Sequence, residues 1–155
     1  MSARKNRILV IDIDQEARAL LAANLRQATY EVIEAGSTQQ ASEVLVRSQL
    51  DIVLLDLTPP CNSGLALCSW LREEMGESVV IVLICHGTTS RERVVGLEMG
   101  ADDVVDKQMD TEELSARLEA HHRRRQLSSN EAYVDGDDDT EERTVKPKSP
   151  HLNHA

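Results

Sequence analysis

The stretch Arg7-Ile-Leu-Val-Ile-Asp-Ile-Asp14 decides the fold class of this chain. Residues 8–11 are all apolar and do not alternate with polar residues, which indicates a strand that is buried on both faces. Two carboxylates, Asp12 and Asp14, follow at the carboxyl end of this strand. The stretch therefore predicts a central strand in a sheet that is covered on both sides.

Further runs rich in β-branched residues and leucine follow at spacings of about twenty to thirty residues. They are residues 30–33, 52–55, 79–84 and, more weakly, 104–105. Apolar residues at helical spacing fill the intervals between these runs. The strict alternation of strands and helices predicts an α/β fold, with a doubly wound, five-stranded parallel sheet and helices on both faces.

The 155 residues have room for one domain, which we expect over residues 1–126. From residue 127 the composition becomes polar and then strongly acidic, which predicts a disordered acidic tail or an interdomain linker over residues 127–155. The formal net charge of −10 argues against non-specific attraction to nucleic acid. The basic cluster at 123–125 closes a predicted helix and is interpreted as a helix cap.

Several classes of protein are not expected from this sequence. No apolar run reaches the roughly eighteen residues of a membrane-spanning helix, and the N-terminus does not resemble a signal peptide, so we expect a cytoplasmic protein. Cys61, Cys68 and Cys85 lack CxxC spacing and are interpreted as reduced core thiols, with a redox pairing of the first two as the alternative. Phosphate-binding glycine loops and a Ser/His/Asp arrangement are missing, so no enzyme is predicted.

Charged residues follow three of the predicted strands. Asp12 and Asp14 end the first strand, Asp56 ends the third, and Lys107 follows the fifth. Ligands of open α/β sheets bind outside the carboxyl ends of the strands, so these residues are expected to converge at one edge of the sheet. Such a group can bind a hard cation, present a carboxylate nucleophile to a phosphoryl group, or form a structural charge cluster. The residues alone leave these three readings open.

Three stretches carry a resemblance to a known family. They are Arg7-Ile-Leu-Val-Ile-Asp-Ile-Asp14, then Asp51-Ile-Val-Leu-Leu-Asp-Leu-Thr-Pro-Pro60 with Ser63-Gly-Leu-Ala-Leu-Cys68, and finally Val95-Gly-Leu-Glu-Met-Gly-Ala-Asp-Asp-Val-Val-Asp-Lys107. Together they strongly resemble the receiver domains of two-component response regulators, from about residue 7 to residue 126.

The resemblance implies strand order 2-1-3-4-5, phosphorylation by a histidine kinase and a bound Mg²⁺ ion. It implies Asp56 as the phosphoacceptor, Asp12 and Asp56 as ligands of the cation, and Lys107 as the contact to the acyl phosphate. In that mechanism the carboxylate attacks a phosphohistidine of the partner kinase, while the cation and the lysine neutralise the phosphoryl oxygens.

The sequence departs from the family pattern at four positions. Ile13 replaces the second acid, Ile84 replaces a Ser or Thr, Val104 replaces an aromatic residue, and Gln108 replaces a proline. Because an isoleucine offers no oxygen ligand, we expect weak or absent Mg²⁺ binding and an atypical receiver with weak or absent phosphorylation. The alternative is a conventional phosphoacceptor in which Asp14 compensates for Ile13.

The predicted output face resembles that of the winged-helix (OmpR/PhoB-type) subfamily, which dimerises through its fourth helix, fifth strand and fifth helix. The matching residues are Arg93, Glu98, Asp102, Asp103, Glu113 and Arg117. The resemblance implies a homodimer in which Arg93 pairs with Glu113 and Asp103 with Arg117 across a two-fold axis. It also implies DNA binding only through a domain that is not present in this chain. The alternative is a solvated, charged helix face.

Overall fold

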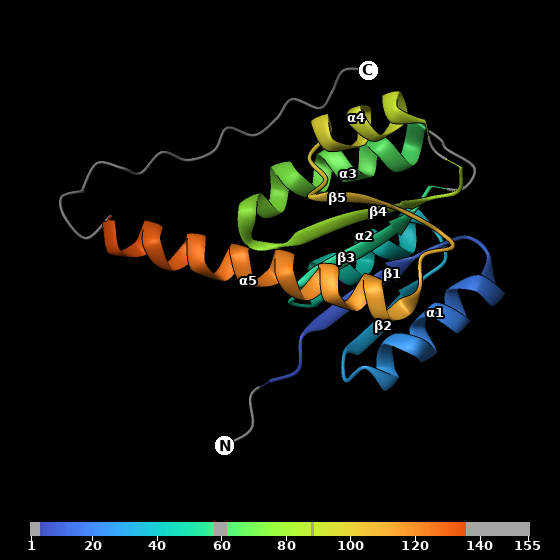
Figure 1. The fold of residues 1–155 in the computed structure, drawn as a ribbon, viewed down its shortest axis with the longest axis horizontal. Coiled ribbons are helices and arrows are strands. Elements are labelled where there is room, and N and C mark those ends of the chain that lie inside the picture. Colours follow the sequence, from blue (N-terminus) through green and yellow to red (C-terminus); the bar gives the residue numbers. More distant parts are fainter. Residues whose placement is uncertain (1–3, 58–61, 88, 136–155) are drawn as a thin grey trace.

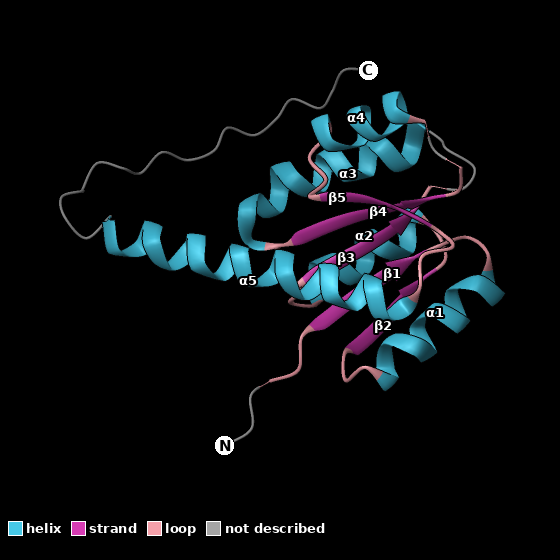
Figure 2. Ribbon diagram, in the orientation of Figure 1, coloured by secondary structure: helices cyan, strands magenta, loops and turns pink. Residues whose placement is uncertain are grey.

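The structure is a computed structural model that describes residues 4–57, 62–87 and 89–135. Its strands are β1 (Arg7–Ile11), β2 (Glu31–Ala35), β3 (Ile52–Asp56), β4 (Val80–Cys85) and β5 (Asp103–Asp106). Its helices are α1 (Gln15–Gln27), α2 (Thr38–Arg47), α3 (Asn62–Met75), the short 3-10 helix η1 (Gly76–Ser78), α4 (Ser90–Glu98) and α5 (Thr111–Asp135). Strands and helices alternate along the chain, as Figure 2 shows.

All strand pairs are parallel, and the order across the sheet is β2-β1-β3-β4-β5. The central strand β1 pairs with β2 on one side and β3 on the other, so Leu9 lies opposite both Ile33 and Val53. Reversal of the strand order beside β1 leaves the carboxyl ends of β1 and β3 open to side chains from the following loops. The predicted α/β fold and strand order are confirmed.

Two apolar cores lie on opposite faces of the sheet (Figure 1). Side chains of β1 alternate between them: Leu9 belongs to the core under α2 and α3, whereas Ile8 belongs to the core under α1 and α5. On the second face, Leu25 of α1 and Leu118 of α5 are fully buried. Burial on both faces explains why the central strands read as continuous apolar runs.

Side-chain caps fix two helix starts next to the carboxyl edge of the sheet. The Asp14 carboxylate accepts hydrogen bonds from the backbone N–H groups of Glu16 and Ala17 at the start of α1. At α4, Thr89 and Glu92 form a capping box in which each side chain accepts a hydrogen bond from the other residue's backbone N–H. These caps satisfy N–H groups that have no partner inside the helix.

Helix α5 continues past residue 126, where the sequence suggested that the ordered domain ends. The helix reaches Asp135, so residues 127–135 are helical rather than disordered. No glycine or proline lies between Thr111 and Asp135, which leaves the helical backbone uninterrupted. Figure 1 shows the last turns of α5 extending past the sheet. Residues 136–155 lie outside the described residues, and the domain boundary at 126 stays a prediction.

Within residues 4–57, 62–87 and 89–135, no helix is both long enough and apolar enough to cross a bilayer.

Candidate functional site

Asp12, Asp56 and Lys107 lie together at the carboxyl edge of the sheet. Asp12 follows β1, Asp56 is the last residue of β3, and Lys107 follows β5. The Nζ atom of Lys107 is 3.0 Å from Oδ2 of Asp56 and 3.6 Å from Oδ2 of Asp12. One ammonium group therefore bridges two carboxylates from strands that are far apart in the sequence.

The two carboxylates are buried, and burial shifts the pKa of Asp12. The side chains of Asp12 and Asp56 are each 4% exposed. Burial raises the pKa of Asp12, and the neighbouring charge of Asp56 adds to this effect, whereas the Asp14 N–H and Lys107 oppose it. Burial lowers the pKa of Lys107, but its hydrogen bonds and charge contacts with Asp56 and Asp12 outweigh burial, so the net pKa is raised. Lys107 is therefore a firmly protonated cation.

Asp14 lies beside this cluster and serves mainly the start of α1. Its backbone N–H donates to Oδ1 of Asp12 across 2.9 Å. Its own carboxylate is exposed and accepts from the N–H groups of Glu16 and Ala17 at 3.1 and 3.2 Å. The Asp14 carboxylate thus has a local helix-capping role, which competes with any use as a cation ligand.

The two isoleucines take different places around the cluster. The Ile13 side chain is 72% exposed and lies on the surface next to Asp12. Ile84 is buried and lies opposite Asp56 in the pairing of β3 with β4. Neither side chain can ligate a cation or donate a hydrogen bond to a phosphoryl oxygen. The polar groups of this cluster are therefore the carboxylates of Asp12 and Asp56 and the ammonium group of Lys107.

Gln108, which stands where the family has proline, contributes a backbone hydrogen bond. Its N–H donates to Oδ1 of Asp106 across 2.8 Å, and this bond is the main reason why the pKa of Asp106 is lowered. A proline would lack the N–H group. The loop that carries Lys107 is thus held by a contact that the family residue could not make.

A cavity of about 280 Å³ opens beside the charged cluster, between α1 and α5. Asp12, Asp56, Ile84 and Lys107 form one end of it. The other walls come from α1, from the loop before α5 and from α5 itself: Leu20, Leu21, Asn24, Met109, Thr111 and Leu114. The site predicted from the sequence did not include these residues.

The described residues contain no group of three or more His, Cys, Asp or Glu side chains placed to hold a metal ion. Asp12 and Asp56 supply two carboxylates, and Lys107 already contacts both of them. Mg²⁺ prefers six oxygen ligands in octahedral geometry, several of which are waters when few carboxylates are available. The donor set fits a magnesium ion poorly.

The predicted output face is charged, and its charges pair within one chain. Arg117 lies 3.1 Å from Asp103 and 3.2 Å from Glu113, and Nε2 of His121 lies 3.0 Å from the same oxygen of Asp103. Arg93 on α4 is exposed and donates a long hydrogen bond to the carbonyl of Val104. Glu98 lies exposed at the end of α4. The residues assigned to a dimer interface therefore lie near one another on α4, β5 and α5.

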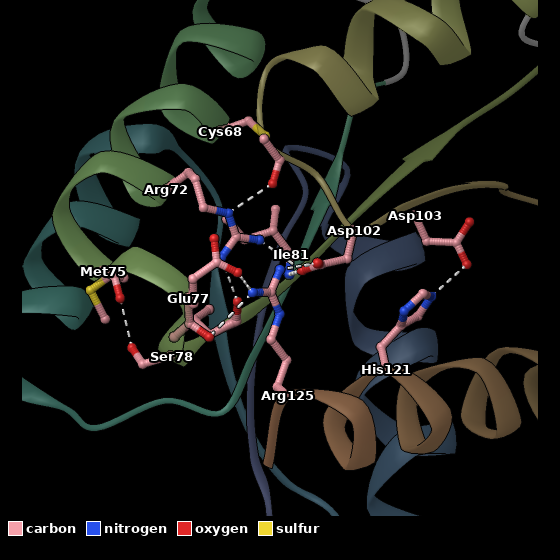
Figure 3. A network of polar contacts seen from close by, with 12 residues as sticks. Cys68, Arg72, Met75, Glu77, Ser78, Ile81, Asp102, Asp103, His121 and Arg125 are labelled. Atoms are coloured by element: carbon pink, nitrogen blue, oxygen red, sulfur yellow. Dashed lines mark hydrogen bonds and ion pairs between the residues drawn. The ribbon is translucent and has the colours of Figure 1, made fainter. Parts of the chain in front are cut away.

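Asp102 differs from the other predicted interface residues, because its side chain is only 14% exposed. It accepts from Arg72 across 2.7 Å and from the backbone N–H of Ile81 across 2.9 Å, and it also pairs with Arg125. Figure 3 shows Asp102 between the two guanidinium groups. The structure thus places Asp102 in an internal network.

Arg125 itself was interpreted from the sequence as part of a helix cap, and this interpretation is wrong. It lies ten residues before the end of α5 and contacts Asp102 and Glu77. Burial and the nearby charge of Arg72 lower its pKa. Arg125 therefore joins the distal half of α5 to η1 and to the start of β5.

Cys68 and Cys85 are buried and free. Burial raises the pKa of each thiol to about 11, so both are protonated at neutral pH. Cys61 lies outside the described residues. The interpretation of Cys68 and Cys85 as reduced core thiols agrees with their burial.

Several known proteins are similar to this chain. The sequence profile of the response regulator receiver domain matches residues 8–119. The phosphate regulon transcriptional regulatory protein PhoB of Pseudomonas aeruginosa is 36% identical over 129 residues, which cover 83% of this chain and 56% of that protein. The transcriptional regulatory protein GltR of the same organism is 33% identical over 129 residues, covering 83% and 53%. This chain thus spans about half the length of these relatives.

Solved structures agree on the fold. NtrX from Brucella abortus has a TM-score of 0.76 at 22% identity, covering 84% of this chain and 29% of that chain. A CheY-like response regulator receiver domain protein from Methanospirillum hungatei has a TM-score of 0.73 at 18% identity, covering 81% and 99%.

Proposed function

Because this chain belongs to the response regulator receiver domain family, we propose that it is an atypical receiver that signals by protein interaction and dimerisation. In this proposal phosphorylation of Asp56 is weak or absent. Receiver domains are signalling domains rather than typical enzymes, and they interact with kinases. The observation that carries the proposal is that Lys107 contacts both buried carboxylates while Ile13 and Ile84 stand at neighbouring positions.

Lys107 contacts both carboxylates, so its ammonium group offsets part of their negative charge. A second carboxylate at residue 13 would add a negative charge and call for a divalent ion, but Ile13 adds neither charge nor ligand. Receiver domains in general bind Mg²⁺ at the phosphorylation site. In this chain the residues that would hold the ion are Asp12 and Asp56, and when bound the ion would neutralise charge on a transferred phosphoryl group.

The conventional alternative uses the same residues. An oxygen of Asp56 would attack the phosphorus of a phosphohistidine, the P–N bond would break, and the imidazole would leave with its electron pair and take up a proton. Lys107 would then contact the acyl phosphate. The position of the Lys107 ammonium 3.0 Å from Asp56 is compatible with this role. The two proposals differ in whether the pocket stabilises the added charge.

The output proposed for the chain is control of a partner through α4, β5 and α5. The exposed charges Arg93, Glu98, Glu113 and Arg117 support a homodimer, and a histidine kinase or another signalling protein is the expected upstream partner. The two relatives named above are transcriptional regulators about twice as long as this chain. We therefore propose that any DNA binding resides in a domain outside this sequence. A cytoplasmic location stays a prediction.

The deciding experiment is labelling of the purified protein by acetyl phosphate with and without Mg²⁺, read by intact-protein mass spectrometry. The expected result is little or no added phosphoryl mass, with no increase when Mg²⁺ is present. The matched control restores the pocket through the double variant Ile13→Asp, Ile84→Thr, which we expect to label when Mg²⁺ is present. Substitution Asp56→Asn in that background should abolish the labelling.

Efficient magnesium-dependent labelling of the unmodified chain, lost in Asp56→Asn, would overturn the atypical reading and establish the conventional one. If the restored variant labels and the natural chain does not, the difference lies in the two isoleucines. The fold itself serves as an internal reference, because circular dichroism of each variant shows whether the sheet and helices are intact.

A further inference from the structure

A second cavity lies under α4, separate from the charged pocket. Its volume is about 180 Å³. The walls come from the end of β3, from α3, from β4 and β5, and from α4 itself: Leu57, Leu65, Leu83, Cys85, Val95 and Val104. All six are apolar side chains or a neutral thiol, and the exposed side chains Arg91 and Glu92 belong to its rim. The cavity thus has an apolar interior and a charged edge.

Close packing at Gly96 prevents α4 from moving inward to fill this space. A Cβ atom at Gly96 would lie 2.9 Å from Cδ1 of Leu83 and 3.0 Å from Cγ2 of Val104, so the helix backbone already touches the sheet side chains at this point. The capping box of Thr89 and Glu92 fixes the start of the same helix. Space beside Gly96 therefore remains because the helix cannot approach further.

The side chain at residue 104 sets how much of the space is filled. Val104 is 5% exposed and ends in two methyl groups, which leave room between β5 and Val95 of α4. Cys85, at the end of β4, adds no charge to the wall, because burial keeps its thiol protonated. Among the described residues, the six interior side chains carry no charge, and the charged residues that line the cavity, Arg91 and Glu92, are exposed at its edge.

We propose that the cavity under α4 binds a small, neutral, apolar molecule of about the size of one aromatic ring. An enclosed, dry cavity of roughly 150 Å³ lined by aliphatic side chains is known to bind benzene, and the cavity under α4, which is open at the edge formed by Arg91 and Glu92, has a similar volume of about 180 Å³. The binding would come from burial of the ligand's apolar surface. An ionised ligand is excluded, because burial of an unpaired charge is costly.

Such a ligand would act on the face that α4 presents to partners. Val95 points to the cavity, whereas Val94 and Leu97 are about half exposed on the same helix, next to Arg93 and Glu98. A molecule that contacts Val95 and Val104 together adds contacts between α4 and β5. The bound ligand should therefore slow hydrogen exchange in α4 more than in α2, which packs against β1 and β2 near the other edge of the sheet.

The test is titration of the full 155-residue chain with benzene, followed by NMR of ¹³C-labelled leucine and valine methyl groups. Saturable shifts are expected at Leu57, Leu83, Val95 and Val104, with no saturable shift at the exposed Val46 on α2. Benzoate, which keeps the ring and adds a charge, should bind about tenfold more weakly or worse.

Two variants locate the site. Val104→Phe places a ring in the cavity and should weaken benzene binding about tenfold or more, since the space is then occupied. Val94→Ala changes an exposed neighbour on the same helix and should leave the affinity unchanged. Leu65→Phe fills the cavity from α3 and replaces Val104→Phe if that variant does not fold.

Three results would overturn the proposal. The first is methyl shifts that rise linearly with benzene concentration and do not saturate. The second is equal benzene affinity in the Val104→Phe variant and the natural chain. The third is benzoate binding as tight as benzene binding. Because no residue of the charged pocket is changed, the outcome is independent of whether Asp56 accepts a phosphoryl group.

Discussion

Arg117 and Asp103 form an ion pair inside one chain, with Nη1 3.1 Å from Oδ2. Residues of α5 and β5 that would pair across a two-fold axis are thus already paired in the single chain. His121 shares the same carboxylate oxygen at 3.0 Å. In a dimer where Asp103 of one subunit pairs with Arg117 of the other, the contact within each chain is lost when the contact between chains forms. The net gain in binding free energy from each new pair is therefore small.

Substitution of Arg117 is expected to weaken self-association modestly. Arg117→Ala should raise the dimer dissociation constant roughly fivefold, as a loss of about 1 kcal/mol implies for a partly exposed pair. Sedimentation velocity over a concentration series measures it. Arg4→Ala removes an ion pair with Asp51, outside α4, β5 and α5, so it is the control and should leave association unchanged. A chain that is monomeric at every concentration tested would contradict the proposed dimer.

Loss of the Asp102 carboxylate should be costly for stability. Asp102→Ala leaves Arg72 and Arg125 without their shared partner and the Ile81 N–H without its acceptor, so we expect a loss of about 2–4 kcal/mol in the free energy of unfolding. Urea denaturation gives the value. The reference substitution is Arg4→Ala, at the exposed end of its ion pair with Asp51. An Asp102 variant as stable as the natural chain would show that the network contributes little.

Neutralising Asp12 should stabilise the protein near neutral pH. A pKa raised in the folded state means that the folded chain holds the Asp12 proton more tightly than the unfolded chain does. This contribution to stability is present below the unfolded value and is lost as pH rises through the raised folded value. Asp12→Asn should therefore increase the free energy of unfolding at pH 7, and the increase should shrink towards pH 3.5. Urea denaturation at both pH values tests the sign.

Gly96→Ala should destabilise the fold, although alanine favours helices. In an open helix this substitution gains roughly 1 kcal/mol. Here the new methyl group would press on Leu83 and Val104, and we expect a net loss of about 1–3 kcal/mol. Thermal and urea denaturation both report it. A gain in stability would show that α4 moves away easily, and the cavity beneath it would then be soft rather than fixed.

The sheet was predictable because its signals are local. Short, continuous apolar runs such as 8–11 indicate strands that are buried on both faces, and alternation with helices leaves few arrangements. Convergence of Asp12, Asp56 and Lys107 follows from the same topology, since all three come directly at or after a strand end.

What escaped prediction depends on contacts between distant segments. Asp102 and Asp103 are adjacent acids of the same type, yet one lies between two arginines and the other faces α5. Asp102 lies just before β5 and Asp103 is its first residue, so their side chains leave the backbone in different directions, and only Asp102 meets Arg72 and Arg125. The cavity under α4 likewise depends on five elements at once, and no short sequence motif predicts it.

The part of α5 after Arg125 extends beyond its last anchoring contact, so a small rotation at that contact moves the end of the helix much further. Arg125 is anchored to Asp102, and ten residues of helix follow it to Asp135, or roughly 15 Å at the usual rise per residue. A tilt of about 10° at the anchor would displace the far end by roughly 2.6 Å for a rod of that length. Small adjustments around Asp102 are therefore enlarged at the end of the helix, where the chain leaves the sheet behind.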